Sequence, residues 1–204
     1  MAGSASIVIN ASDYSVWKRS ILGGILGYIN LRGEKKEIDT KTQQDLLIPE
    51  YNIVIKDTIL GDGVTIWSNV NIYGAKIGEN TKIGAFVEIR KGVEIGKNVK
   101  IEPLVFIPEG VKIGNCVFLG PNVVFTNDVY PRSCTKEGKL IEEYEITTTI
   151  VKDGTSIGAQ SVIMCGITIG ENALIGLGST VMKDVPSNSV VFGEKAKLRR
   201  LIDE

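Results

Sequence analysis

The sequence predicts an all-β domain in which short strands are joined by tight corners, and three observations support this prediction. A large apolar residue recurs every six positions over most of the chain. A second series, mostly valine, follows four positions later, and glycine often comes directly after the first series. A helix needs an apolar period of 3.6 residues and a simple strand a period of two, so neither element alone fits this pattern.

The first series has no exception between residues 77 and 125, where its members are Ile77, Ile83, Ile89, Ile95, Ile101, Ile107, Ile113, Leu119 and Phe125. The period extends back to Leu60 with a single position missing before Ile77, and it resumes from Val151 to Val181. The glycines that follow the series are expected at corners, which a residue without Cβ adopts at little cost. We interpret both sets as core and corner residues without a chemical role.

This pattern resembles the hexapeptide repeat of the left-handed parallel β-helix, in which three consecutive hexapeptides form one triangular coil. Residues separated by three hexapeptides would then stack at about 4.8 Å, the spacing between paired strands. We therefore expect a β-helix over residues 50–186, and a long loop at residues 126–150 that projects from it.

Residues 1–49 lie outside the repeat and predict a short N-terminal extension. One segment starts with the cap residues Ser12 and Asp13, and two adjacent glycines later in it weaken a helix. Its apolar residues have helix-like spacing: Trp17, Ile21, Ile25 and Tyr28. We expect a short helix or an arm that closes the lower end of the β-helix, with docking to a membrane or partner as the alternative. Residues 187–204 predict a tail that ends in a short helix.

The composition narrows the class of protein. A chain of 204 residues can bury one core, and a net charge of −1 predicts no bulk attraction to nucleic acid or to an anionic membrane. The most apolar window, residues 21–31, is too short to span a bilayer. Three irregularly spaced cysteines (Cys116, Cys134 and Cys165) are typical of reduced thiols. These features predict a soluble, cytoplasmic protein without a metal site.

Histidine is absent from the sequence. This excludes any mechanism that needs an imidazole base or a histidine-bound metal.

The six-residue period stops at Thr126 and does not resume until after Ile150. Loops longer than about 12 to 15 residues in a compact domain are usually functional or disordered. The alternating residues Tyr144–Ile150 predict a strand-like return, which favours an ordered loop. We therefore expect the chemistry of the protein at this interruption.

Three segments resemble the nucleotide-sugar N-acetyltransferases of the hexapeptide acyltransferase superfamily, which acetylate 3-amino sugars on UDP or dTDP for surface polysaccharides: "NIYGAKIGENTKIGAFVEIRKGVEIGKNVKI", "VFIPEGVKIGNCVFLGPNVVFTNDVYPRS" and "IGAQSVIMCGITIGENALIGLGSTVMKDVP". The hexapeptide pattern indicates the superfamily, whereas "GPNVVFTNDVYPRS" before a long insertion is a narrower marker. The resemblance implies a homotrimer with active sites between subunits, and acetyl-CoA along the late coils.

The resemblance also implies that Asn127, Asp128 and Glu109 line the amino-sugar pocket. The sequence supports this independently, because Asn127 follows Glu109 by three hexapeptides, one full coil. Asn127 would orient the sugar amine or the thioester, and Asp128 would pair with a protonated amine. The alternatives are an Asn that opens a loop, an Asp that caps a turn and a Glu at an ordinary corner.

Further residues are candidates for substrate binding. Tyr130 and Arg132 suit stacking on a base or sugar and pairing with a diphosphate, because a guanidinium presents a planar fork of donors. They are equally consistent with a rigid start to the loop. Arg90 could reach phosphate or remain a solvated surface residue.

In the late coils, Gly158, Ala159 and Gly176 would let the pantetheine arm of CoA approach the backbone. Lys183 or Arg199 would meet the CoA phosphates. Leu177 stands where the family has a small residue, and "GEKAK" replaces the usual "GNPA", so both segments depart from the family pattern.

Two other functions compete with N-acetylation. A noncatalytic trimeric β-helix would gain nothing from interrupting its stack. O-acetylation of a sugar or another small alcohol is the stronger competitor, but hexapeptide O-acetyltransferases mostly use a histidine to remove the alcohol proton. An amine with a pKa of about 8 is already partly neutral at pH 7 and needs no strong base. The absence of histidine therefore favours an amine as the acceptor.

Overall fold

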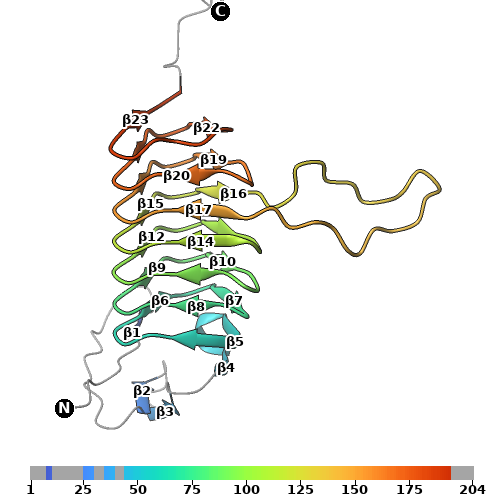
Figure 1. Cartoon of the computed structure of the whole chain (residues 1–204). Helices are drawn as coiled ribbons and strands as arrows, with labels where there is room; N and C mark the ends of the chain where they lie inside the picture. Colours follow the sequence, from blue (N-terminus) through green and yellow to red (C-terminus); the bar gives the residue numbers. More distant parts are fainter. Residues whose placement is uncertain (1–7, 11–24, 30–34, 40–43, 194–204) are drawn as a thin grey trace, which may run out of the picture.

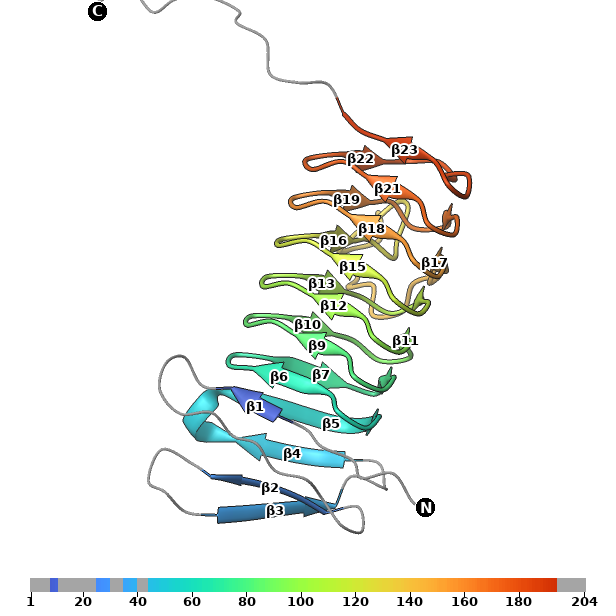
Figure 2. The ribbon, with the colours of Figure 1, turned by 90° about the vertical axis from the view of Figure 1, so that its left-hand side faces the viewer.

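The structure is a computed structural model that describes residues 8–10, 25–29, 35–39 and 44–193, and its body is a stack of parallel strands (Figure 1). The strands form three faces that run the length of the stack (Figure 2). The first face is an eight-stranded sheet of β1 (Val8–Asn10), β6 (Thr65–Trp67), β9 (Lys82–Ile83), β12 (Lys100–Ile101), β15 (Phe118–Leu119), β18 (Ser156–Ile157), β21 (Leu174–Ile175) and β23 (Val190–Val191).

The other two faces belong to one 13-stranded sheet that shares the long strand β5 (Ile53–Leu60). The second face continues from β5 through β7 (Asn71–Tyr73), β10 (Glu88–Ile89), β13 (Phe106–Ile107), β16 (Val124–Phe125), β19 (Val162–Ile163) and β22 (Thr180–Val181). The third face continues through β8 (Lys76–Ile77), β11 (Glu94–Ile95), β14 (Val111–Ile113), β17 (Thr149–Val151) and β20 (Thr168–Ile169).

The strand register confirms the coil predicted from the sequence. Ile77 pairs with Ile95 and Ile95 with Ile113, so each coil of the regular region consists of three hexapeptides. In the lowest coils Ile66 pairs with Ile83, one position short of a regular coil, which accounts for the position missing from the period. The fold is therefore an all-β parallel β-helix, while its left-handed sense stays a prediction.

Both apolar series of the repeat point into the stack. Ile83, Ile107 and Leu119 from the first series are fully buried, as are Val93 and Val123 from the second. Because paired residues stack directly on one another, their side chains form continuous apolar columns, and burial of such side chains is the dominant favourable term in folding. The chemically distinctive residues are thereby left to the corners and the loop.

The corner glycines are required for close approach rather than for a positive φ angle. A Cβ on Gly78 would lie 2.5 Å from the carbonyl of Gly96 in the next coil. A Cβ on Gly96 would likewise lie 2.6 Å from the carbonyl of Gly114, one coil further up. The positive φ angle falls two positions later, at Asn80 and Asn98. The expected reason for these glycines, relief of corner geometry, was therefore wrong.

The N-terminal extension contributes strands where the spacing predicted a helix. Ile25–Ile29 forms β2, which pairs antiparallel with β3 (Lys35–Asp39). The β-branched and aromatic residues of this segment favour strands, and its glycines disfavour helix. Residues 11–24 lie outside the described part of the chain.

Three further elements lie at the lower end of the stack (Figure 2). Strand β4 (Gln44–Ile48) pairs antiparallel with β5 and leads into a 3₁₀ helix, η1 (Pro49–Tyr51). Strand β1 adds to the first face beside β6.

The upper end differs from the expected boundary at residue 186. Strand β23 pairs with β21 through Leu174 and Val190, so a coil shorter than the regular one extends the stack to Val191. The six-residue period is lost there although the strand pairing continues. The predicted C-terminal helix and Arg199 lie outside the described residues. Within the described residues, no helix is long and apolar enough to cross a membrane.

Candidate active site

The interruption of the period is a loop that projects from the stack between β16 and β17 (Figure 1). Ile113 pairs with Val151, so the loop is inserted into a single coil and makes it more than twice as long as a regular one. At its base the Thr147 amide donates to the carbonyl oxygen of Asn127 at 3.1 Å. Of the predicted strand-like return, Tyr144–Ile150, only Thr149 and Ile150 lie in a strand.

The loop leaves from the corner between the second and third faces, which we call the loop corner. Each strand of the second face ends near this corner, and the residue two positions after its buried residue lies at the corner itself. These corner residues form a vertical column through the coils: Gly74, Lys91, Glu109, Asn127, Cys165 and Lys183. The offset of one coil between Glu109 and Asn127 therefore places these two side chains one above the other, as the sequence predicted.

Three polar side chains meet at the base of the loop. Asn127 Nδ2 donates to Glu109 Oε2 at 3.1 Å and to Tyr144 Oη, also at 3.1 Å. Because a carboxylate only accepts hydrogen bonds, the NH₂ group of Asn127 must face Glu109. In the described part of the chain no donor reaches Asn127 Oδ1, which leaves this oxygen able to accept a hydrogen bond from an amine. Sequence reasoning missed Tyr144, whose only signal was its place at the start of the alternating segment.

Arg90 holds Glu109 from below rather than standing free. Its Nε donates to Glu88 Oε1 at 2.9 Å, its Nη1 lies 3.9 Å from Glu109 Oε1, and its guanidinium lies over the ring of Phe106 at 5.3 Å. Burial lowers the pKa of Arg90, but the hydrogen bond to Glu88 and the neighbouring charges outweigh it and leave the pKa above its ordinary value. Arg90 is a constant cation between two carboxylates.

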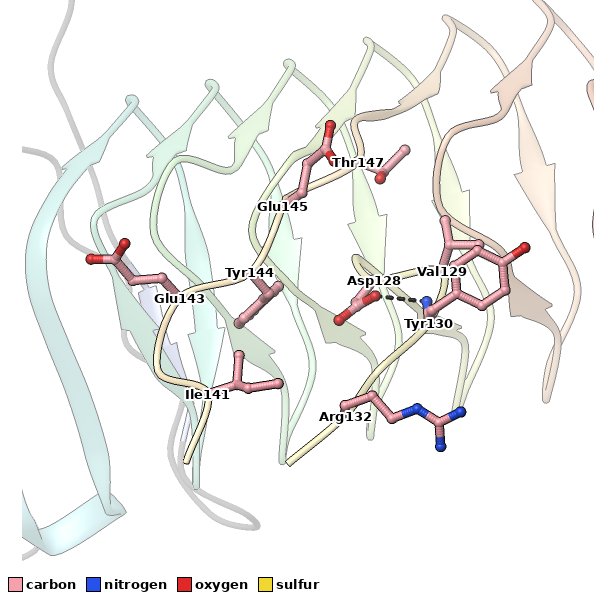
Figure 3. Close-up of a pocket in the computed structure, with 9 residues that line it drawn as sticks. All are labelled: Asp128, Val129, Tyr130, Arg132, Ile141, Glu143, Tyr144, Glu145 and Thr147. Atoms are coloured by element: carbon pink, nitrogen blue, oxygen red, sulfur yellow. Dashed lines mark hydrogen bonds between the residues drawn. The ribbon is translucent and has the colours of Figure 1, made fainter. Parts of the chain in front are cut away.

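The two limbs of the loop enclose a cleft of about 460 Å³ (Figure 3). Its walls are Asp128, Val129, Tyr130 and Arg132 from the outgoing limb and Ile141, Glu143, Tyr144, Glu145 and Thr147 from the returning limb. Asp128 Oδ1 accepts a hydrogen bond from the Tyr130 amide at 2.7 Å, which is the turn-capping role expected as the alternative. The structure thus brings Asp128, Tyr130 and Arg132 to one cleft beside Asn127.

Three of the expected CoA residues lie on a different corner. Gly158 and Ala159 follow β18 and Gly176 follows β21, so all three are at the corner between the first and second faces. A Cβ on Gly158 would lie 2.5 Å from the Leu177 amide nitrogen, which gives this glycine a packing role. Lys183 is exposed on the loop corner, two coils above Asn127. One chain therefore does not bring Asn127 and Ala159 together.

The repeat matches two family models. One, described as bacterial transferase hexapeptide (six repeats), matches residues 74–109 and 92–127, and the other, hexapeptide repeat of succinyl-transferase, matches residues 149–183. Stacked coils with this repeat define a hexapeptide-repeat transferase domain. The chain carries this hexapeptide repeat and is similar in sequence and fold to hexapeptide-repeat acetyltransferases.

Similar proteins act on different acceptors. The dTDP-3-amino-3,6-dideoxy-alpha-D-galactopyranose 3-N-acetyltransferase of Aneurinibacillus thermoaerophilus is 49% identical over 51 residues, 25% of this chain and 27% of that protein. The bifunctional protein GlmU of Methylococcus capsulatus is 28% identical over 150 residues, 72% of this chain and 32% of that protein. The crystal structure of a maltose O-acetyltransferase from Clostridium difficile 630 aligns with a TM-score of 0.51 and 26% identity, over 63% of this chain and 70% of that chain.

The chain spans only part of these relatives. It covers 32% and 27% of the two curated proteins named above.

Proposed function

We propose that this protein transfers the acetyl group of acetyl-CoA to the amino group of a nucleotide-linked (UDP or dTDP) amino sugar, for a surface polysaccharide. The observation that carries this proposal is the Glu109–Asn127–Tyr144 cluster at the base of the loop, in a chain without histidine. The likeness to a dTDP-amino-sugar 3-N-acetyltransferase supports the same class of acceptor. Active sites between the subunits of a homotrimer belong to this proposal.

The amine supplies most of the reactivity. An amino group with a pKa of about 8 is partly neutral at pH 7, so it can attack without a strong base. Asn127 Oδ1 accepts one N–H of the amine and orients its lone pair toward the thioester carbonyl carbon. A C–N bond forms, the tetrahedral intermediate collapses, and the C–S bond breaks to release the CoA thiolate. The carboxylate of Asp128 or Glu109 takes the proton that the nitrogen loses.

O-acetylation is the second candidate, because the maltose O-acetyltransferase shares the fold over 70% of its chain. An alcohol hardly ionises near neutral pH and needs a general base. The bases that this site offers are carboxylates, and a carboxylate is a weaker base than an imidazole: Asp128, Glu109, Glu143 and Glu145. The geometry therefore favours the amine. The third candidate, a noncatalytic scaffold, leaves the polar cluster and the loop cleft without a role.

An acceptor panel tests the proposal. Acetyl-CoA is incubated with dTDP- and UDP-linked amino sugars, with the matching hydroxyl sugars and with maltose, and the release of free thiol is followed. We expect turnover with at least one nucleotide-linked amino sugar and none with its hydroxyl counterpart. Faster turnover of a hydroxyl acceptor would establish O-acetylation instead. The absence of both turnover and acetyl-CoA binding would favour the scaffold.

A further inference from the structure

A second concave surface lies on the loop corner, below the site described above. It has a volume of about 660 Å³, and its walls are Lys56, Asp57, Ile59, Tyr73, Gly74, Ala75, Lys76, Lys91 and Gly92. The pocket forms where β5 bends from the second to the third face and the next two coils turn beside it. We call it the lower pocket.

The lower pocket is cationic. Three lysines line it against the carboxylate of Asp57. Some lysines elsewhere on the stack have acidic partners, as Lys100 does with Glu102 at 2.9 Å. By contrast, no ion pair joins Lys56, Lys76 or Lys91 to an acidic side chain in the part of the chain that the structure describes. Concave surfaces lined by one sign of charge concentrate ligands of the opposite sign, so the lower pocket favours an anion.

The lower pocket also has an aromatic wall. Tyr73 is half-buried, and its hydroxyl donates to Glu88 Oε1 at 3.4 Å, which fixes the ring. Burial raises the pKa of Tyr73 and the carboxylates of Glu88 and Glu109 raise it further, against the opposing charge of Arg90, so the phenol stays neutral. At Gly92 an added Cβ would meet no atom within 4 Å, so this side of the pocket is open.

The lower pocket and Asn127 are separated by a distance that suits a sugar with a phosphate group. Lys91 lies one coil below Glu109 and two coils below Asn127 in the same column. Two strand spacings put the backbones of Lys91 and Asn127 about 10 Å apart. A hexose ring bearing a diphosphate can span this distance, because the long lysine side chains can reach toward the phosphates. Arg90, the expected phosphate ligand, is already paired with Glu88 and Glu109.

We infer that the lower pocket binds the diphosphate of the nucleotide-linked acceptor through Lys56, Lys76 and Lys91, with the nucleoside against Tyr73 and the sugar directed toward Asn127. This inference rests on the proposed function and deepens it. CoA also contains a diphosphate, but the residues expected to hold CoA are in the late coils: Gly158, Ala159 and Gly176 lie at another corner, and Lys183 lies four coils above Lys91. The ligand chemistry is a diphosphate, and the source to which we assign it is the acceptor nucleotide.

Calorimetric titration with dTDP, UDP, inorganic pyrophosphate and acetyl-CoA tests the inference. The double variant Lys76→Ala/Lys91→Ala should weaken binding of the preferred nucleoside diphosphate about tenfold or more, because two charge-assisted contacts are lost. Its affinity for acetyl-CoA should stay within about twofold of wild type, and pyrophosphate should compete with the nucleotide in the wild-type protein.

Two control variants show whether lost affinity comes from the positive charge of the lower pocket, rather than from removing any surface lysine or from unfolding. Lys112→Ala removes a lysine from the same face as Lys76, two coils higher, where its partner is Glu94 at 4.0 Å. It should leave nucleotide affinity within about twofold of wild type. Lys76→Arg/Lys91→Arg keeps the charge and should retain most of the affinity, which would show that the alanine variant lost binding and not its fold.

The outcomes distinguish the two proposals. The inference is overturned if the wild-type protein binds neither nucleoside diphosphate, if the double alanine variant binds them normally, or if acetyl-CoA is the ligand whose affinity falls. If the protein acetylates a free amino sugar and binds no nucleotide, the proposed role of the lower pocket is wrong, while N-acetylation as the reaction still stands. Nucleotide binding that depends on these lysines, without any acetyl transfer, would support the pocket and overturn the proposed function.

Discussion

The side chain of Asn127 illustrates how a single residue can be oriented by its neighbours. Its NH₂ group is committed to Glu109 Oε2 and Tyr144 Oη, at 3.1 Å each. Glu109 is in turn held by Arg90, whose Nη1 lies 3.9 Å from Glu109 Oε1. An orienting group fixed in advance costs little reorganisation during reaction, which is why alignment can contribute several kcal/mol to catalysis.

We therefore expect Asn127→Ala to reduce kcat severalfold to about 100-fold, a loss of up to roughly 3 kcal/mol at about 1.4 kcal/mol per tenfold. Tyr144→Phe keeps the ring and removes only the hydroxyl that meets Asn127, so its loss should be smaller. Steady-state kinetics with the preferred amino sugar measure both. A wild-type kcat in Asn127→Ala would exclude an orienting role.

The carboxylates should act mainly in binding. Asp128→Asn and Glu109→Gln keep shape and remove charge, so we expect a higher KM for the amino sugar and a smaller change in kcat, because an amine needs little general-base help. The pair KM and kcat, measured for each variant, separates the two effects. Abolished turnover with intact substrate binding would mean that an obligatory base is present.

Asp153 carries a pH-dependent contribution to stability. Asn115 donates to it through its side chain, with Nδ2 at 3.0 Å from Oδ2, and through its backbone amide at 2.8 Å from Oδ1, and these bonds lower the pKa of Asp153 below its ordinary 3.8. A lowered pKa means that the folded state is stabilised above about pH 3.8, and that this contribution is lost as the pH falls through the folded value.

Asp153→Asn should therefore be less stable than wild type at pH 7, with the difference shrinking below pH 3.8. Urea unfolding of both proteins at several pH values gives this difference directly. A difference that is constant with pH would show that the ionised carboxylate is not responsible.

Among the elements, the corners depend on two kinds of glycine. An added Cβ on Gly96 would lie 2.6 Å from the carbonyl group of Gly114, whereas Gly92 has a φ of +79° and free space beside it. We expect Gly96→Ala to cost about 1 to 3 kcal/mol through overpacking against backbone. Gly92→Asn should cost less than about 1 kcal/mol, because Asn tolerates the left-handed region.

Denaturant midpoints of the two glycine variants test this contrast. Equal losses would contradict the distinction between close approach and backbone conformation. Asn80 and Asn98 occupy positive-φ positions equivalent to that of Gly92, which makes Asn the matched substitution there.

The sequence predicted the coils well because their pattern is local and repeated. The pairing of Ile77, Ile95 and Ile113 follows from the period alone, and so does the stacking of Asn127 on Glu109. The contact of Tyr144 with Asn127 depends on how a non-repeating limb returns to the stack, which no period encodes. The gathering of Lys56 with Lys76 and Lys91 depends on the bend in β5, so it was not predicted either.

At the scale of the whole molecule, the two halves of the expected site lie on separate corners of one stack. Asn127 is at the loop corner and Ala159 at the corner between the first and second faces. If both contribute to one reaction, they must come from two chains. Closed rings of identical subunits place different corners of neighbouring protomers against each other at every interface, which fits the expected homotrimer.

Mixed assemblies provide the test of this arrangement. Asn127→Ala disables one half of the site, by up to about 100-fold as argued above, and Ala159→Trp blocks the other half with a bulky side chain. The test applies where each variant alone has well below one quarter of wild-type activity. In trimers formed at random from equal amounts of both, about one quarter of the interfaces pair an intact Asn127 with an intact Ala159 from the neighbouring chain. Coexpression should then restore roughly that share of wild-type activity, measured as thiol release per site. If both halves act within one chain, no mixed assembly contains an intact site and activity stays at the level of the single variants.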